Sequence, residues 1–270
     1  MRKILISLLF LPLACFAHPN SVVYNVTNDT VVHGSLFCEE VSIASISKLM
    51  TVYTVLQYNQ SMDEKLTVTG NKVTNTKLRK GMILTRQELI NLALVSSDNL
   101  AAITLAENFP GGMNHFIYNM NNNSKTLGMH QTGFVEPTGL SPMNHSTVGD
   151  IIKLTKAVSE YTIVQHAAQT QRVVSPVELA KNNKTKKKRK AVKEPKKPKS
   201  QVVAGNPTSR YFGHEGLITI KTGFTNAAGF CITMLLYANN QLYNITVLGA
   251  RTKQEREKLV KQSLAKIYNT

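Results

Sequence analysis

The feature that most constrains the fold is a short stretch after residue 45 that is apolar on nearly every face of a helix. Its apolar residues are Ile46, Leu49, Met50, Val52, Tyr53, Val55 and Leu56. A helix without a polar face is stable only when other elements surround it. The stretch therefore predicts a helix through the middle of a domain, and 270 residues of 42% hydrophobic composition can supply the surrounding core.

Strands are expected at both ends of the chain, with helices between them. Two β-branched runs around Asn28-Asp29 predict a hairpin, and Thr85 and Glu88 have the spacing of a capping box. The predicted helices span residues 85–95, 100–108, 113–127, 147–159 and 252–268. The predicted strands near the end of the chain span residues 217–221, 229–237 and 241–248. No regular element is predicted between Pro176 and Gly216. Because β-α-β alternation is absent, this order predicts an α+β fold, an antiparallel sheet with a mainly helical subdomain.

The first 17 residues have the parts of an export signal. Arg2 and Lys3 precede an apolar run of about 13 residues, and small residues at 15 and 17 suit cleavage after Ala17. The run is too short to span a bilayer, which takes about 20 residues, so no transmembrane anchor is expected. The sequence predicts an exported protein, periplasmic or secreted, whose mature domain covers residues 18–270.

The positive charge is concentrated in one segment. Of the net charge of +16, a local +10 lies from Lys181 to Lys199, where eleven Lys and Arg face the single Glu194. This segment has little apolar content to bury, so it is expected to be a disordered insertion, 181–199. A solvated loop is one interpretation. The other is a tether for a polyanion such as an anionic wall polymer or lipid; nucleic acid is disfavoured, because the run has no aromatic residue to stack on bases.

Three short polar motifs are candidates for chemistry. Ser45-Ile-Ser-Lys48 opens the buried helix, where residues three apart share a face and burial can lower the pKa of the lysine enough to make it a base. Ser97-Asp98-Asn99 is a polar break between two apolar helical stretches, and Lys221-Thr-Gly223 ends a predicted strand, where the glycine allows a close backbone approach. No His and Cys residues have metal-ligand spacing, so neither a metal nor another cofactor is expected.

Taken together, the motifs and their surroundings resemble one family. S-x-x-K, S-D-N and K-T-G occur in this order in penicillin-binding proteins and class A β-lactamases. The family of low-molecular-mass D-alanyl-D-alanine carboxypeptidases and endopeptidases resembles this chain in four stretches, 42–50, 92–102, 134–141 and 221–231. The D,D-endopeptidases of that family resemble it most. The resemblance implies a penicillin-binding-protein transpeptidase/β-lactamase-like fold, peptidoglycan stem peptides as substrates and β-lactam antibiotics as covalent inhibitors.

The resemblance also implies a role for each motif residue. Ser45 would be the nucleophile, Lys48 its base, and Ser97 the relay that returns a proton to the leaving amine. The substrate would be bound by Asn99, Lys221, Thr222 and Gly223. The backbone N–H groups of Ser45 and Phe224 would form the oxyanion hole.

Two other functions compete with this one. A class A-like β-lactamase needs a deacylating Glu in a loop reading Glu-Pro-x-x-Asn; Glu136-Pro137 begins in that way, but residue 140 is Leu. The second is a non-catalytic secreted protein that binds polyanions or the cell wall; it would keep a peptidase-like fold but would not need all three motifs. The complete set of motifs favours the serine D,D-peptidase.

Overall fold

The structure is a computed structural model that describes residues 19–34, 38–71, 73–179, 200–205, 211 and 214–269. The predicted export signal, 1–17, and the basic segment, 181–199, lie outside these residues. In the described part of the chain, no helix has both the length and the apolar character to cross a membrane.

A five-stranded antiparallel sheet joins the two ends of the chain, as the sequence predicted. Its strand order is β2-β1-β11-β10-β9. The strands are β1 (Asn20–Asn25), β2 (Thr30–Gly34), β9 (Leu217–Thr225), β10 (Gly229–Ala238) and β11 (Gln241–Ala250). The predicted hairpin is β1-β2, and its turn residue Asp29 has a φ of 57°.

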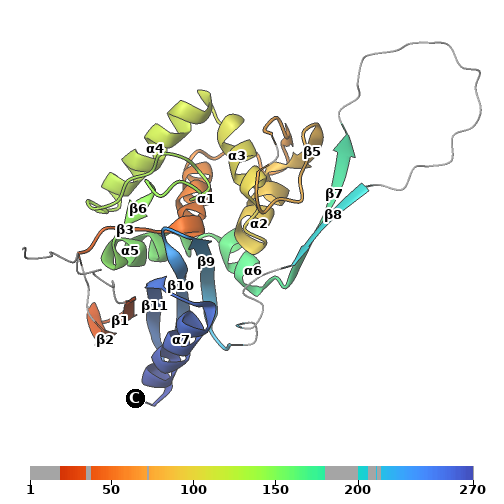
Figure 1. Ribbon diagram of the computed structural model, residues 1–270. Coiled ribbons are helices and arrows are strands. Elements are labelled where there is room, and N and C mark those ends of the chain that lie inside the picture. The colour runs from red at the N-terminus through yellow and green to blue at the C-terminus, as the bar shows by residue number, and fades with distance from the viewer. Residues whose placement is uncertain are drawn as a thin grey trace, which may run out of the picture.

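Both faces of the central strands β10 and β11 are covered, so these strands are apolar on both sides, whereas the edge strand β2 is largely exposed. Successive residues point to opposite faces of a strand. Val22 and Cys231 belong to the core shared with the helical layer, whereas their neighbours Val23 and Ile232 belong to a second core under the C-terminal helix α7 (Lys253–Tyr268). Figure 1 shows α7 on one side of the sheet and the helices α1 to α5 gathered on the other.

The helical layer surrounds α1 (Ser47–Gln57), the predicted central helix. The other helices are α2 (Arg86–Val95), α3 (Asn99–Glu107), α4 (Gly112–Thr126), α5 (Val148–Val158) and α6 (Thr162–Gln169). Helix α1 contacts α2, α3, α4 and α5, and its residues from Ser47 to Val52 are completely buried. The capping box of α2 is present, with Thr85 and Glu88 each accepting the other's backbone N–H.

Three parts of the fold differ from the sequence prediction. Strand β7 (Arg172–Leu179) pairs with β8 (Ser200–Gly205) where no element was expected, and this hairpin lies beside α2, at the edge of the helical layer in Figure 1. It joins a second sheet with β4 (Lys65–Thr67) and β5 (Met82–Thr85). Helix α6 was also not predicted. Finally, α1 begins two residues later than expected, because a 3-10 turn, η1 (Ala44–Ile46), precedes it. Two short strands, β3 (Val41–Ser42) and β6 (His145–Ser146), pair beside this turn.

Candidate active site

The first motif lies where η1 leads into α1. Ser45 is in the turn and is partly exposed, whereas Lys48 is in the first turn of α1 and is completely buried. The preceding residue, Ala44, has a φ of 47°, a left-handed conformation that is uncommon for a residue with a side chain. Such strain persists only where the surroundings enforce it. The turn thus keeps the Ser45 hydroxyl at the surface while its partner stays in the core.

The amine of Lys48 has three neighbours. Its Nζ lies 2.9 Å from Ser45 Oγ, 2.7 Å from Asn99 Oδ1 and 2.7 Å from the carbonyl oxygen of Thr138. The oxygens of Asn99 and Thr138 can only accept hydrogen bonds. When the amine is neutral, its two N–H groups therefore satisfy these oxygens, and its lone pair is left facing the Ser45 hydroxyl.

Burial also sets the protonation of Lys48. It lowers the pKa of the amine from 10.5 to about 7, although the negative charges of Glu136 and Asp98 act in the opposite direction. A base with a pKa close to 7 is neutral in a large fraction of molecules at neutral pH. Lys48 can therefore accept a proton from Ser45 without extreme conditions.

The second motif is the connection between α2 and α3. Ser97 has a φ of 57°, and Asp98 caps α3 by accepting the backbone N–H of Ala101. Asn99 is buried; its side chain contacts Lys48 through the oxygen and donates from Nδ2 to the carbonyl oxygen of Thr74, 2.8 Å away. This orientation is fixed by groups on both sides of the amide.

The third motif lies inside β9, which continues to Thr225 rather than ending at Lys221 as predicted. Gly223 is required here because β9 passes directly against η1. A Cβ at this position would lie 2.9 Å from the backbone nitrogen of Ser45 and 3.0 Å from the carbonyl oxygen of Ile43. Phe224, the next residue of β9, and Ser45 both border one pocket.

Lys221 links the second and third motifs. Its Nζ is 2.9 Å from Ser97 Oγ and 2.9 Å from the carbonyl oxygen of Thr222. Complete burial lowers the pKa of this amine well below 10.5, and the positive charges of Lys48 and Arg256 lower it further. The structure thus brings all the predicted side chains together around two buried amines.

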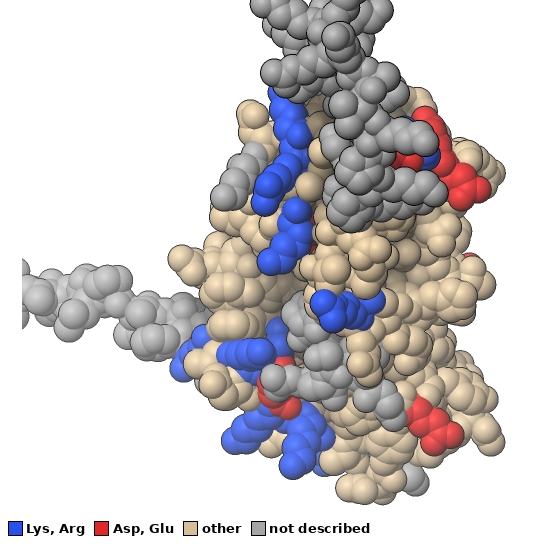
Figure 2. Space-filling view, turned by 90° about the vertical axis from the view of Figure 1, so that its right-hand side faces the viewer, with Lys and Arg blue, Asp and Glu red and all other residues tan. Residues whose placement is uncertain are grey.

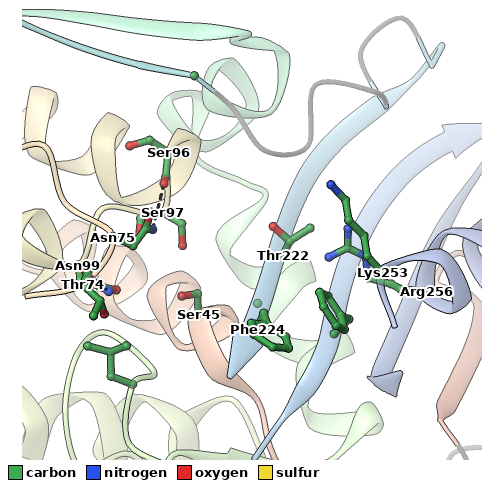
Figure 3. Close-up of a pocket in the computed structure, with 14 residues that line it drawn as sticks. Ser45, Thr74, Asn75, Ser96, Ser97, Asn99, Thr222, Phe224, Lys253 and Arg256 are labelled. Carbon is green, nitrogen blue, oxygen red and sulfur yellow. Dashed lines mark hydrogen bonds between the residues drawn. The ribbon is translucent and has the colours of Figure 1, made fainter. Parts of the chain in front are cut away.

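The motif residues that line a pocket of 620 Å³, which opens to solvent (Figure 3), are Ser45, Ser97, Asn99, Thr222 and Gly223. Figure 3 shows Ser45 between Asn99 and Ser97 on one side and Thr222 on the strand at the other. Lys253 and Arg256, from the first turn of α7, also border the pocket, as do Asn75 and Phe230. Arg256 is held by an ion pair to Glu257, 2.5 Å long. Sequence analysis missed these four residues, because a cation in an amphipathic helix or an Asn in a loop carries no local signal.

The loop that contains Glu136 supports the site from behind. Both carboxylate oxygens of Glu136 accept hydrogen bonds from its own loop, from the backbone of Thr138, Gly139 and Ser141 and the hydroxyl of Thr138. Gly139, with a φ of 79°, packs so closely that a Cβ there would collide with the carbonyl oxygen of Ala44. Glu136 is therefore a structural residue of this loop, and its side chain does not border the pocket.

No group of three or more His, Cys, Asp or Glu within the described residues is arranged to hold a metal ion. The thiols of Cys38 and Cys231 are free, the first exposed and the second buried. The pocket offers hydroxyls, amides and amines, which suit nucleophilic rather than metal-assisted chemistry.

An antiparallel sheet with a helical layer, with a serine and a buried lysine at the junction, defines the penicillin-binding protein and β-lactamase-like fold class. Residues 21–252 match the model of the peptidase S11 family, described as D-alanyl-D-alanine carboxypeptidase. The chain therefore belongs to that family, as its motifs predicted.

Two curated relatives carry the name D-alanyl-D-alanine endopeptidase. The one from Escherichia coli (strain K12) is 37% identical over 213 residues, and the one from Pseudomonas aeruginosa is 34% identical over 217 residues. These alignments cover 77% and 78% of this chain but 63% and 64% of the relatives, so the chain spans somewhat less than two thirds of their length. The names agree with the predicted similarity to D,D-endopeptidases.

Solved structures support the same fold. The Streptomyces K15 DD-transpeptidase has a TM-score of 0.79 at 20% identity, covering 93% of this chain and 97% of that one. Penicillin-binding protein D2 from Listeria monocytogenes, in its ampicillin-bound form, has a TM-score of 0.73 at 26% identity, covering 92% and 96%. The architecture predicted from the order of elements is confirmed.

Proposed function

We propose that this protein is a serine D,D-peptidase that hydrolyses D-Ala-containing peptide bonds of peptidoglycan, as a cross-link endopeptidase, a D-Ala-D-Ala carboxypeptidase or both. The observation that carries the proposal is the 2.9 Å contact between Lys48 Nζ and Ser45 Oγ at the edge of an open pocket. The names of the relatives and of the family support the choice of substrate.

The reaction begins when Ser45 Oγ attacks the carbonyl carbon of the penultimate D-Ala and its proton passes to Lys48. The backbone N–H groups of Ser45 and Phe224 stabilise the oxyanion that forms, and one such donor is typically worth about 3 kcal/mol. The general base contributes roughly 10² to 10⁴ in rate. Collapse of the tetrahedral intermediate breaks the peptide bond and leaves an acyl group on Ser45.

The leaving amine needs a proton, and Ser97 is the group that delivers it. Its hydroxyl accepts a hydrogen bond from Lys221, which holds it in place to pass on to the amine the proton that Lys48 took from Ser45. Asn99 holds the substrate amide, and Thr222 with Gly223 receives the carboxylate region. Water then hydrolyses the acyl group and restores the Ser45 hydroxyl.

β-Lactams are ligands of the same serine, because their strained amide resembles the peptide that Ser45 attacks. The ampicillin-bound and cefotaxime-bound forms of the Listeria protein support this extension. Turnover as a β-lactamase is disfavoured, since the carboxylate of Glu136 is occupied within its own loop and has no place beside an acyl-enzyme.

The decisive experiment is mass spectrometry of the intact protein and its peptides after treatment with penicillin. One adduct on Ser45 is expected, together with loss of the adduct and of peptide hydrolysis in Ser45→Ala. Ser47→Ala is the matched control, because its hydroxyl accepts from Asn144 and lies outside the pocket. An adduct elsewhere, or hydrolysis that survives in Ser45→Ala, would remove the assignment.

The basic segment from Lys181 to Lys199 acts in this proposal as an electrostatic tether to an anionic wall polymer or lipid. Replacing it with an uncharged linker of equal length is expected to weaken binding to sacculi at low salt and to leave hydrolysis of a short D-Ala-D-Ala peptide unchanged. The difference should vanish at high salt, since the Debye length is about 10 Å at 0.1 M. Equal binding at low salt would make the segment a passive insertion.

Export to the periplasm or medium completes the proposal, with residues 18–270 as the mature peptidase domain. Sequencing of the N-terminus of the secreted protein should then find His18 first. Retention of residues 1–17 would contradict the cleavage site.

A further inference from the structure

The pocket at Ser45 continues into two further hollows. The next one, of 310 Å³, shares Thr74, Asn75, Ser96 and Gly205 with the lining of the Ser45 pocket. An outer hollow of 460 Å³ shares Thr76 and Lys77 with the middle one. Each hollow therefore adjoins the next along the segment 73–80, and the three together are called the groove below. A substrate longer than a dipeptide can extend along it.

One wall of the groove is the segment 73–80, which is fixed to the second motif. Asn75 Nδ2 donates to the carbonyl oxygen of Ser97, 2.7 Å away. The backbone N–H of Asn99 donates to the carbonyl oxygen of Asn75, 3.1 Å away. Thr76 and the backbone of Lys77 both donate to the carboxylate of Asp98. Asp98 thereby holds the wall in register with Ser97 and Asn99.

The opposite wall is the end of β8. Gly205 borders both the Ser45 pocket and the middle hollow, and a Cβ built on it would meet no atom within 4 Å. Among the described residues, the space directly beside Gly205 is therefore open.

The outer end of the groove is positively charged. Lys77, Arg79 and Lys80 border the outer hollow, and all three are exposed. Within the part of the chain that the structure describes, none of these side chains has an ion pair or hydrogen bond. Among the described residues that line the three hollows, Asp98 alone carries a carboxylate, and this group already accepts hydrogen bonds from Thr76 and the backbone of Lys77. Figure 2 shows Lys and Arg side chains in several separate groups on the side of the molecule that carries β7 and β8 in Figure 1, with few Asp and Glu among them.

We propose that this groove is a binding site for an acidic peptide, the second stem of a cross-link, with its free carboxylates at Lys77, Arg79 and Lys80. The inference rests on the proposed function and deepens it. A D-Ala-D-Ala carboxypeptidase releases a single amino acid and has no use for a groove beyond the leaving group. A cross-link endopeptidase releases a whole stem peptide, which carries several carboxylates and needs a place to lie. The groove therefore favours cross-links as the preferred substrate.

The test compares three substrates on the wild type and on Arg79→Gln/Lys80→Gln. The substrates are a cross-linked peptide dimer, the same dimer with the carboxylates of its second stem amidated, and a short D-Ala-D-Ala peptide. Exposed charge pairs are individually weak, so KM for the acidic dimer is expected to rise roughly threefold to tenfold in the variant. KM for the amidated dimer and kcat for all three substrates should stay unchanged, and added salt should reduce the effect.

Lys258→Gln/Lys261→Gln is the matched control, because these lysines of α7 are exposed and lie away from the groove. This control should leave KM for the acidic dimer unchanged. Equal changes in both double variants would mean that only net charge matters and would overturn the site. So would a wild type that does not distinguish the acidic dimer from the amidated one. If penicillin does not acylate Ser45 in the wild type, the proposed function is refuted, whatever the result for the groove.

Discussion

The pH dependence of Ser45 acylation tests whether Lys48 is the base. Burial lowers the pKa of this amine from 10.5 to about 7. At pH 7 the neutral form is then about half of all molecules, whereas a lysine with the ordinary pKa would be neutral in about one molecule in 3,000. The structural position of Lys48 thus increases the reactive fraction by about three orders of magnitude.

The direction of the effect follows from which form reacts. Only the neutral amine accepts a proton, so the acylation rate should fall about tenfold for each pH unit below 7 and reach a plateau above about pH 8. The measurement is the second-order rate of acylation by a fluorescent penicillin between pH 5 and 9. A fluorescent penicillin is suitable because the label on the protein reports acylation directly, so no coupled assay is needed.

Two controls separate titration from unfolding. Circular dichroism at each pH should show an unchanged fold, and Lys48→Gln should acylate slowly with no rise through pH 7. A flat profile for the wild type, or a rise that begins only near pH 10, would refute the argument that burial activates Lys48. The same inflection in Lys48→Gln would assign it to another group.

Three further outcomes are expected. Glu136→Gln should move the midpoint of the acylation profile below pH 7, because the negative charge that raises the pKa of Lys48 is removed; an upward shift would contradict this. Leu49→Ala should lower the free energy of unfolding by about 2–5 kcal/mol in urea titrations, since Leu49 is completely buried in the central helix. A thiol reagent should label exposed Cys38 in the folded protein and Cys231 only after unfolding, because burial raises the pKa of Cys231 to about 11; labelling of native Cys231 would show that the core opens.

The central helix and the sheet could be predicted from sequence because each has a strong local pattern. An apolar stretch without a polar face, such as 46–56, can only be buried, and the strands at 229–237 and 241–248 are covered on both sides. The candidate site residues could be named because three short motifs occur in a fixed order. Each of these features is set by residues that lie close together in the sequence, so the sequence pattern alone reveals it.

Other parts of the site depend on contacts between distant segments. The hairpin β7-β8 was missed for two reasons. A basic run separates its strands, and some of its exposed positions, such as Val174 and Val203, are apolar, so the strands lack the alternation of apolar and polar residues that is typical of a half-buried strand. The left-handed conformation of Ser97 is enforced by the tertiary contacts of its loop. Arg256 reaches the pocket only because α7 folds back over β10, a contact with no signature in the sequence around it.

The two buried lysines limit the positive charge that the pocket itself can hold. The charge on Lys48 helps to lower the pKa of Lys221, so the free protein disfavours having both amines protonated. The positive charge of Arg256, which also lines the pocket, lowers the pKa of Lys221 as well. A substrate carboxylate in this pocket would raise the pKa of Lys221 and so draw a proton from solvent. Calorimetry in buffers of different ionisation enthalpy should detect that uptake for a peptide with a free terminal carboxylate and not for its amide; equal uptake for both would place the titrating group away from the carboxylate.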